Sequence, residues 1–291
     1  MTAIGFIGFG EAGFTIANGL RGAGIAGIHA YDIAWESPDR GRLIRERAEC
    51  AGVTLVTSPA ALTEQADILF STVTSSSALA AVEQTARFLT TRHLYADLNS
   101  VSPALKRQIA GIVRGRDAKF VEVAVMAPVA PYGHAVPMLL GGPHAETFAA
   151  ALRPFGMRLD ALPGDIGTAA AVKMCRSIVV KGLEAILCEC VLGAGAYGAD
   201  AQVFASLQES FPGIEWSRLA DYTMNRLVVH GERRAREMEE VAETLRAMGV
   251  EPIMAEATAR RQDWGAQLNL KSRFGPEGPQ TYAQVLDALR T

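Results

Sequence analysis

The stretch Ile4–Gly13 reads IGFIGFGEAG and decides the fold. Its first four residues suit a buried strand, and they lead directly into Gly8, Gly10 and Gly13, which have the spacing G-x-G-x-x-G. A helical pattern follows from Glu11 to Arg21. In this context Gly8 permits the tight turn, Gly10 lets a pyrophosphate approach the backbone, and Gly13 lets helix and strand pack closely. The stretch therefore predicts a strand, turn and helix that bind a dinucleotide at the N-terminus of the helix.

Asp32 is the second element of the predicted cofactor site. It follows the second predicted strand, 19 residues after Gly13, where an acid accepts hydrogen bonds from the adenosine ribose. A carboxylate there also repels a 2′-phosphate, so we expect NAD. NADP stays possible, because Arg40 and Arg42 follow and would hold a phosphate if their loop folded back. The predicted cofactor-binding residues are Gly8, Gly10, Glu11, Ala12, Gly13, Asp32, Thr72, Val73 and Thr74.

Short β-rich runs alternate with helical patterns up to about residue 162, and helical patterns alone continue after Pro163-Gly164. The sequence therefore predicts an α/β Rossmann domain over 1–163, with a doubly wound, mostly parallel sheet, and an all-helical substrate and dimerisation domain over 164–291. A helix that starts near Ile166 is expected to join them. The predicted strands are Ile4–Ile7, Ile28–Tyr31, Val53–Val56, Ile68–Val73, Leu94–Leu98, Phe120–Val125 and Met138–Leu140. In the first domain the predicted helices are Glu11–Arg21, Arg40–Cys50, Ala78–Leu89, Pro103–Val113 and Ala145–Leu152.

Composition excludes several classes of function. The 291 residues carry 28 Lys+Arg against 31 Asp+Glu, and no segment concentrates positive charge, so nucleic acid is not an expected partner. The four cysteines lack metal-ligand spacing, and no metal site is expected. The apolar stretch Ile178–Ala196 contains Lys181, Glu184 and Glu189, each of which a bilayer centre would penalise by roughly 2.5 to 3.5 kcal/mol. We therefore expect a cytoplasmic protein without a membrane span, and a signal peptide is not indicated.

Polar residues also end the predicted strands that follow the cofactor turn. Thr72–Thr74 end the fourth strand and are expected under the nicotinamide ribose, because ligands lie outside the carboxyl ends of parallel strands. By the same rule, Asn99 and Ser100 are predicted to offer an amide and a hydroxyl to a substrate. An alternative stays open for the serines: Ser100 or Ser102 would cap the helix that begins near Pro103.

These motifs together resemble the β-hydroxyacid dehydrogenase superfamily, which includes 6-phosphogluconate and 3-hydroxyisobutyrate dehydrogenases. The glycine turn Gly8–Gly13, the pair Asn99-Ser100, and Gly164–Gly167 followed by Lys173 are similar to family motifs in order and spacing. The resemblance implies that Lys173 is catalytic, that the protein is a homodimer, and that the substrate is a small anionic hydroxy acid or sugar acid. The most similar subgroup is phosphogluconate dehydrogenase-like, with a C-terminal domain of unknown function.

Lysine suits the chemistry that the resemblance implies. Oxidation of an alcohol to a ketone needs a base within hydrogen-bond reach of the hydroxyl. Burial of Lys173 near Arg176 would bring the amine pKa towards neutrality through desolvation and like charge. The alternative is an ordinary surface lysine on a helix.

Departures from the family pattern narrow the interpretation. Where the family has Asp-Ala-Pro-Val-Ser-Gly-Gly, this chain has EVAVMAP over Glu122–Pro128, so substrate contacts there must differ. Ser177 replaces a common Asn four residues after Lys173. Val180 replaces the Glu that serves as an acid in phosphogluconate enzymes, which makes decarboxylation by that acid doubtful.

One predicted helix face in the second domain also carries charge. His230, Arg233, Arg234 and Glu237 have the spacing i, i+3, i+4 and i+7, which suits either carboxylate binding or a solvated face with Arg–Glu pairs. The predicted substrate-binding residues are Asn99, Ser100, Arg176, Ser177, His230 and Arg233. Together the observations predict an NAD(P)-dependent oxidoreductase that acts on CH–OH with Lys173 as acid and base. The alternatives are a non-catalytic NAD-binding sensor and an imine reductase-like enzyme.

Overall fold

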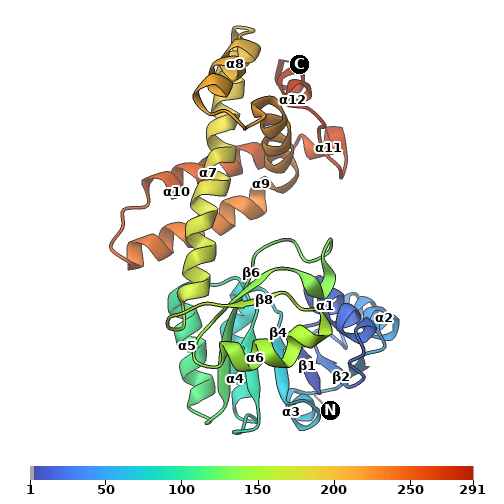
Figure 1. Ribbon diagram of the computed structural model, residues 1–291. Helices are drawn as coiled ribbons and strands as arrows, with labels where there is room; N and C mark the ends of the chain where they lie inside the picture. Colours follow the sequence, from blue (N-terminus) through green and yellow to red (C-terminus); the bar gives the residue numbers. More distant parts are fainter. Residues whose placement is uncertain (1–2, 291) are drawn as a thin grey trace. The chain divides into compact units, whose positions relative to one another are not determined.

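The computed structural model describes residues 3–290 (Figure 1). The chain forms two compact units, Met1–Lys173 and Met174–Thr291. A sheet with helices makes up the first, and the second is built from helices. The predicted order, a Rossmann α/β region followed by an all-helical region, is confirmed.

Within residues 3–290, eight strands form one sheet in the order β3-β2-β1-β4-β5-β6-β7-β8. The pairs from β3 to β6 are parallel, β7 runs antiparallel to β6, and β8 is parallel to β7. The strand order reverses between β1 and β4, and ligands of such sheets bind outside the carboxyl ends at this point. The strands are β1 (Ile4–Ile7), β2 (Ile28–Tyr31), β3 (Thr54–Leu55), β4 (Ile68–Ser71), β5 (Leu94–Asp97), β6 (Lys119–Val125), β7 (Met138–Gly141) and β8 (Leu159–Ala161).

Helices cover both faces of the sheet and bury two separate apolar cores. On one face, Ile16, Ile44 and Phe148 come from α1, α2 and α6. On the other, Leu62 and Val82 come from α3 and α4, and α5 packs beside them. Because both faces are covered, the central strands are apolar on both sides. These helices are α1 (Glu11–Gly22), α2 (Arg40–Ala51), α3 (Pro59–Gln65), α4 (Ala78–Ala86), α5 (Pro103–Arg114) and α6 (Ala145–Leu152).

Two short elements of the first unit lie outside the sequence predictions. They are α3, with seven residues, and β8, with three. Neither is long enough for a clear apolar period, and the structure supports them by other means. Ser58 caps α3 by accepting a 3.1 Å hydrogen bond from the Ala61 N–H, and β8 extends the sheet beside β7.

The helix that leaves the sheet is α7 (Thr168–Ala196), which starts close to the predicted Ile166. Its second half packs in the helical unit, where Leu187 and Val191 join Met224 and Leu227 in an apolar core. In residues 3–290, no helix is both long and apolar enough to cross a membrane. The other helices of this unit are α8 (Asp200–Ser210), α9 (Trp216–Ala247), α10 (Ile253–Gln267), α11 (Lys271–Phe274) and α12 (Tyr282–Arg290).

A buried ion pair ties α7 to α9 within the helical unit. Glu184 is 1% exposed, and its carboxylate accepts hydrogen bonds from the Nε and terminal nitrogens of Arg234, the first at 2.7 Å. Gln262 from α10 donates a third hydrogen bond, at 2.9 Å, to the same carboxylate. The Arg234 side chain is therefore buried against Glu184. The sequence spacing predicts it on one helix face with His230 and Arg233.

A second, less buried set of charges lies beside this pair. Glu237 accepts from Lys181 at 2.9 Å and also pairs with Arg233. Lys181 donates a further 3.3 Å hydrogen bond to Ser177. The Arg233–Glu237 pair is one of the Arg–Glu pairs expected from the spacing as the alternative to carboxylate binding.

His230 provides a pH-dependent test of this cluster. Burial, together with Arg226, Arg233, Arg234 and Lys271, lowers its pKa from 6.5 to about 4. Folding therefore favours the neutral imidazole, and the unfolded chain takes up a proton more readily. This contribution to stability is complete above pH 6.5 and is lost as the pH falls towards about 4.

We predict that His230→Gln makes the unfolding midpoint of the helical unit less dependent on pH in that window. The midpoint is measured by urea titration with tryptophan fluorescence, because Trp216 and Trp264 lie in this unit. His29, whose pKa burial also lowers, lies in the first unit, so His29→Gln serves as the control. Equal slopes in wild type and His230→Gln would contradict the prediction.

Candidate functional site

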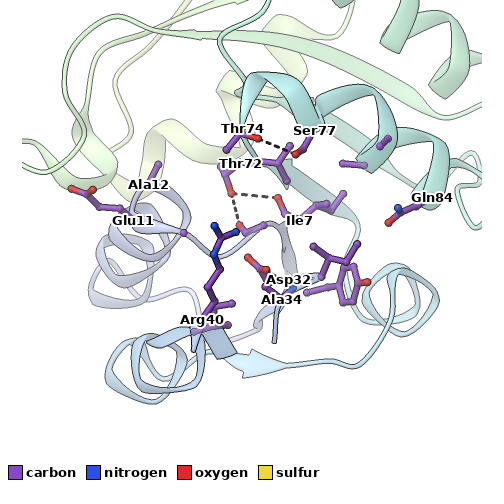
Figure 2. A pocket seen from close by; sticks show the side chains of 18 of the residues that line it. Ile7, Glu11, Ala12, Asp32, Ala34, Arg40, Thr72, Thr74, Ser77 and Gln84 are labelled. Carbon is purple, nitrogen blue, oxygen red and sulfur yellow. Dashed lines mark hydrogen bonds between the residues drawn. The ribbon is translucent and has the colours of Figure 1, made fainter. Parts of the chain in front are cut away.

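A cavity of about 650 Å³ opens at the carboxyl ends of β1, β2 and β4. This volume is in the range of small-molecule sites, roughly 300 to 1,000 Å³. Its wall contains most of the predicted cofactor residues, and Figure 2 shows how Thr72, Asp32 and Arg40 surround it. The predicted residues in its lining are Gly8, Gly10, Glu11, Ala12, Asp32, Thr72, Val73 and Thr74.

The glycine turn is held against the loop that follows β4. Gly8 has φ of 84°, a left-handed conformation that favours glycine. The Thr72 hydroxyl donates a 2.6 Å hydrogen bond to the Gly8 carbonyl, which fixes the turn (Figure 2). A Cβ on Gly13 would lie 2.8 Å from both the Gly8 oxygen and the Thr72 Oγ1. Gly13 thus lies against the turn instead of in the cavity wall.

The N-terminus of α1 has the features of a phosphate site. Gly10 is its N-cap residue and supplies no side-chain hydrogen bond. A Cβ built on Gly10 would meet nothing within 4 Å, so the backbone here is open to a ligand. The first-turn N–H groups and the positive end of the helix dipole favour an anion at this place. The residues present therefore fit the pyrophosphate of a dinucleotide.

Asp32 lies beside the turn, at the end of β2. One carboxylate oxygen accepts the Phe9 N–H at 2.7 Å, and the other accepts the Ala34 N–H at 2.9 Å. Asp32 therefore holds the loop in shape. Each oxygen keeps a second lone pair, which suits a ribose hydroxyl.

Cations also line this end of the cavity. Arg40 and Arg47 lie on one face of α2, with Leu43 and Ile44 between them, and all four line the cavity. Neither arginine has a hydrogen bond or ion pair within residues 3–290. Arg42 lies outside the cavity lining and is 3.8 Å from Glu46 in an exposed pair. The arginines that line this end of the cavity are thus Arg40 and Arg47.

Asn99 lies in a buried polar network at the end of β5. Its amide donates to Ser71 at 2.9 Å and also to Asp97. Asp97 is in turn 3.0 Å from the ammonium of Lys106, which is 1% exposed. In the described part of the chain, the Asn99 Oδ1 is buried and has no hydrogen-bond partner. That oxygen can only accept a hydrogen bond, so a ligand there would have to donate one, for example from a hydroxyl group.

Of the two serines that follow Asn99, only Ser102 caps the helix α5. Ser102 is the N-cap of α5 and accepts from the Leu105 N–H at 3.2 Å, with Pro103 as the first helical residue. Ser100 is exposed and does not cap the helix.

The remaining predicted residues lie on α7 and α9. Lys173 is half-buried and ends the first unit, while Arg176 is exposed and Ser177 is half-buried in the second. His230 and Arg233 lie on α9 in the charge cluster of the helical unit.

Sequence reasoning missed three buried charges of the first unit. Lys106 and Asp97 support Asn99, and Glu122 accepts two hydrogen bonds from the start of α7. The available signal was a charged residue inside an otherwise apolar strand or helix face, as in FVEVAV over 120–125. The sequence could not indicate the partners, because they lie up to 48 residues away.

Comparison with known proteins agrees with this geometry. Residues 3–155 match the family model of the NAD-binding domain of 6-phosphogluconate dehydrogenase. Residues 194–265 match a domain of unknown function, DUF1932. The combination confirms the family resemblance that the sequence motifs indicated.

Three relatives illustrate the range of similarity. A conserved hypothetical protein from Sinorhizobium meliloti is 36% identical, with a TM-score of 0.86 over 99% of this chain and 96% of that one. A conserved protein of unknown function, described as structurally similar to 3-hydroxyacid dehydrogenases, is 29% identical, with a TM-score of 0.78 over 91% and 97%. The mitochondrial 3-hydroxyisobutyrate dehydrogenase of Drosophila melanogaster is 25% identical over 74% of this chain and 65% of its own length. The chain therefore belongs to the family with the NAD-binding domain of 6-phosphogluconate dehydrogenase.

Proposed function

We propose that this protein is an NAD(P)-dependent oxidoreductase that transfers hydride between the nicotinamide and the hydroxyl-bearing carbon of a small hydroxy acid or sugar acid. The observation that carries the proposal is the cavity at the strand-order reversal, where the open Gly10 backbone and Asp32 line one wall. The family match supports dinucleotide binding. Residues 1–163 would bind the cofactor, and residues 164–291 would contribute to substrate binding and dimerisation.

The bound cofactor would accept or donate the hydride at its nicotinamide ring. Lys173 would remove the hydroxyl proton in oxidation and return it to the carbonyl oxygen in reduction. One observation supports this role: Lys173 belongs to the same compact unit as the residues that line the cavity. The amine is therefore carried by the unit that would hold the cofactor.

Polar groups near the strand ends would orient the substrate. The Asn99 Oδ1 is suited to accept from a substrate hydroxyl, because its amide nitrogen is already bound by Ser71 and Asp97. Ser100 is exposed and would add a hydroxyl. Arg176, Ser177, His230 and Arg233 would contribute to carboxylate binding, with His230 neutral near pH 7 because its pKa is lowered to about 4.

We propose NAD as the preferred cofactor. The carboxylate of Asp32 has lone pairs left for the ribose hydroxyls and repels a 2′-phosphate. Arg40 and Arg47 oppose this preference, since they line the same end of the cavity without a partner among residues 3–290. NADP would therefore bind as a second choice.

A second copy of this chain is the proposed partner in a homodimer. Val179 and Ile186 are seven residues apart on the part of α7 that belongs to the helical unit, and they are 70% and 54% exposed. Residues at this spacing lie near one face of a helix, so they form an apolar stripe along α7. Two such stripes would bury each other, and the net charge of −3 is small enough to permit self-association.

We predict that Lys173→Ala lowers the turnover of hydroxy acids by about 10²- to 10⁴-fold, the usual contribution of a general acid and base. NADH formation is measured across a panel of 3-hydroxy acids and sugar acids with NAD and NADP. Lys119→Ala is the control, because Lys119 is an exposed lysine of the same unit. Unchanged turnover in Lys173→Ala would remove this lysine from the mechanism. Cofactor binding without turnover of any compound would favour a sensor.

We predict that Asp32→Ala weakens NADH binding by roughly 10- to 100-fold, the worth of a hydrogen bond to a charged group. NADPH binding falls less, because repulsion of the 2′-phosphate is removed at the same time. Titrations of NADH and NADPH fluorescence measure both affinities, with the exposed Asp39→Ala as the control. Equal losses for the two cofactors would contradict the assignment of Asp32.

We predict that Val179→Glu converts the dimer to a monomer, since a charge in an apolar interface loses its hydration without gaining a partner. Sedimentation velocity measures the mass. Ile253→Glu is the matched control, because Ile253 is 60% exposed and belongs to another helix, α10. A wild-type monomer, or a dimer that survives Val179→Glu, would overturn the proposed interface.

A further inference from the structure

Glu122 is a fully buried carboxylate in the middle of β6. Its exposed fraction is 0%, and it lies between the β5 residue Asp97 and the β7 residue Gly141 in the sheet register. One oxygen accepts the Gly167 N–H at 2.6 Å, and the other accepts the Ala170 N–H at 2.6 Å. Both oxygens are thus used to hold the first turn of α7.

The surroundings of Glu122 are shaped to admit its side chain. A Cβ on Gly141 would collide with the Glu122 Oε2, so the neighbouring strand leaves space there only because it has glycine. Gly167, which donates one of the two hydrogen bonds, has φ of 106°, a conformation that favours glycine. Two glycines therefore permit one contact between the sheet and α7.

This contact differs from an ordinary surface cap. An uncompensated buried carboxylate would be strongly unfavourable, and here two N–H donors and the positive end of the α7 dipole compensate it. Ser58, the N-cap of α3, accepts a single 3.1 Å hydrogen bond from the N–H of Ala61, three residues further along the chain. Glu122 reaches across 45 and 48 residues instead, so it fixes α7 to the sheet.

Lys173 follows the clamped residue Ala170 by three positions, which is about one helical turn. A helix transmits a shift or tilt of its first turn to the next, because successive turns are joined by backbone hydrogen bonds. Misplacement of a reacting group by about 1 Å costs on the order of 10²-fold in rate. A shift of the first turn of α7 would therefore move the backbone that carries the Lys173 side chain.

We propose that Glu122 is a positioning residue, which holds the first turn of α7 against the sheet and so sets the position of the Lys173 amine in the cofactor-binding unit. The proposal rests on the proposed function in one respect, the role of Lys173 in proton transfer. The clamp itself can be tested without any substrate.

Glu122→Gln in the full chain is the main test. Glutamine keeps the size of the side chain, but its Nε2 cannot accept an N–H, so one of the two hydrogen bonds is lost. Amide hydrogen exchange of peptides that cover Gly167–Lys173 is expected to quicken. The pH profile of Lys173 labelling by an amine reagent, followed by mass spectrometry, is expected to shift. NADH affinity stays as in wild type, and turnover of any hydroxy acid found as a substrate falls on the order of 10- to 100-fold.

Two further variants separate positioning from general loss of stability. Gly141→Ala keeps the Glu122 carboxylate in the chain but places a Cβ against its Oε2, so the carboxylate must shift and the variant should reproduce the labelling shift. Ser58→Ala removes a helix cap of the same unit far from Lys173 in sequence, and it should leave labelling and turnover unchanged even where it lowers the melting temperature.

Unchanged exchange over Gly167–Lys173 in Glu122→Gln would overturn the clamp. Faster exchange with an unshifted Lys173 labelling profile and normal turnover would overturn positioning. Full turnover by Lys173→Ala would refute the catalytic role instead, and the exchange and labelling data would still report on the clamp. The two failures are thus distinguishable.

Discussion

The close approach of the Gly8–Gly13 turn to the loop after β4 is the constraint on which the cofactor site depends. Gly13 leaves no room for a Cβ beside the Gly8 oxygen and the Thr72 hydroxyl, and that hydroxyl holds the turn at 2.6 Å. With the turn in place, the backbone at Gly10 faces the cavity and α1 begins there without a side-chain cap. The strand order determines which loops meet at this point, because β1 and β4 are neighbours where the order reverses. The arrangement leaves the positive end of one helix available to a phosphate.

The start of α7 differs from the start of α1, because a side chain of the protein accepts hydrogen bonds there. Two N–H groups at this start, those of Gly167 and Ala170, donate to the chain's own carboxylate, Glu122, which is fully buried. One helix terminus of the unit is therefore open to a ligand and another is fixed to the sheet. We infer that this division serves one reaction: α1 would hold the cofactor, and α7 would hold the residue that moves the proton. Buried charges elsewhere have the same character, since Lys106 with Asp97 and Arg234 with Glu184 each fix elements through hydrogen-bonded pairs.

The sequence predicts those strands and helices whose signals lie within a short stretch of the chain. The strands from β1 to β7 and the helices α1, α2 and α6 start within a residue of the expected positions, because apolar runs and glycine turns lie within one short window. The short β8 and α3 lacked such a window. The hydrogen bonds of Glu122 could not be predicted, since its partners are 45 and 48 residues away. The spacing predicts Arg234 on a helix face with His230, but its side chain is buried in an ion pair with Glu184. Residue types and spacing thus indicated which groups the site contains, while the long-range contacts that orient them required the structure.

The proposed function requires this chain to move hydride between a nicotinamide and a hydroxyl-bearing carbon. Transfer of deuterium from the cofactor to the product would demonstrate this step. The protein is incubated with NADH or NADPH that carries deuterium at both C4 positions of the nicotinamide, and with a panel of 3-oxo acids, and the products are examined by mass spectrometry. We expect a hydroxy acid that gains one deuterium at the new CH–OH carbon, faster with NADH than with NADPH. Cofactor that binds but keeps its label with every compound, or label that appears only in products of cyclic imines, would contradict it.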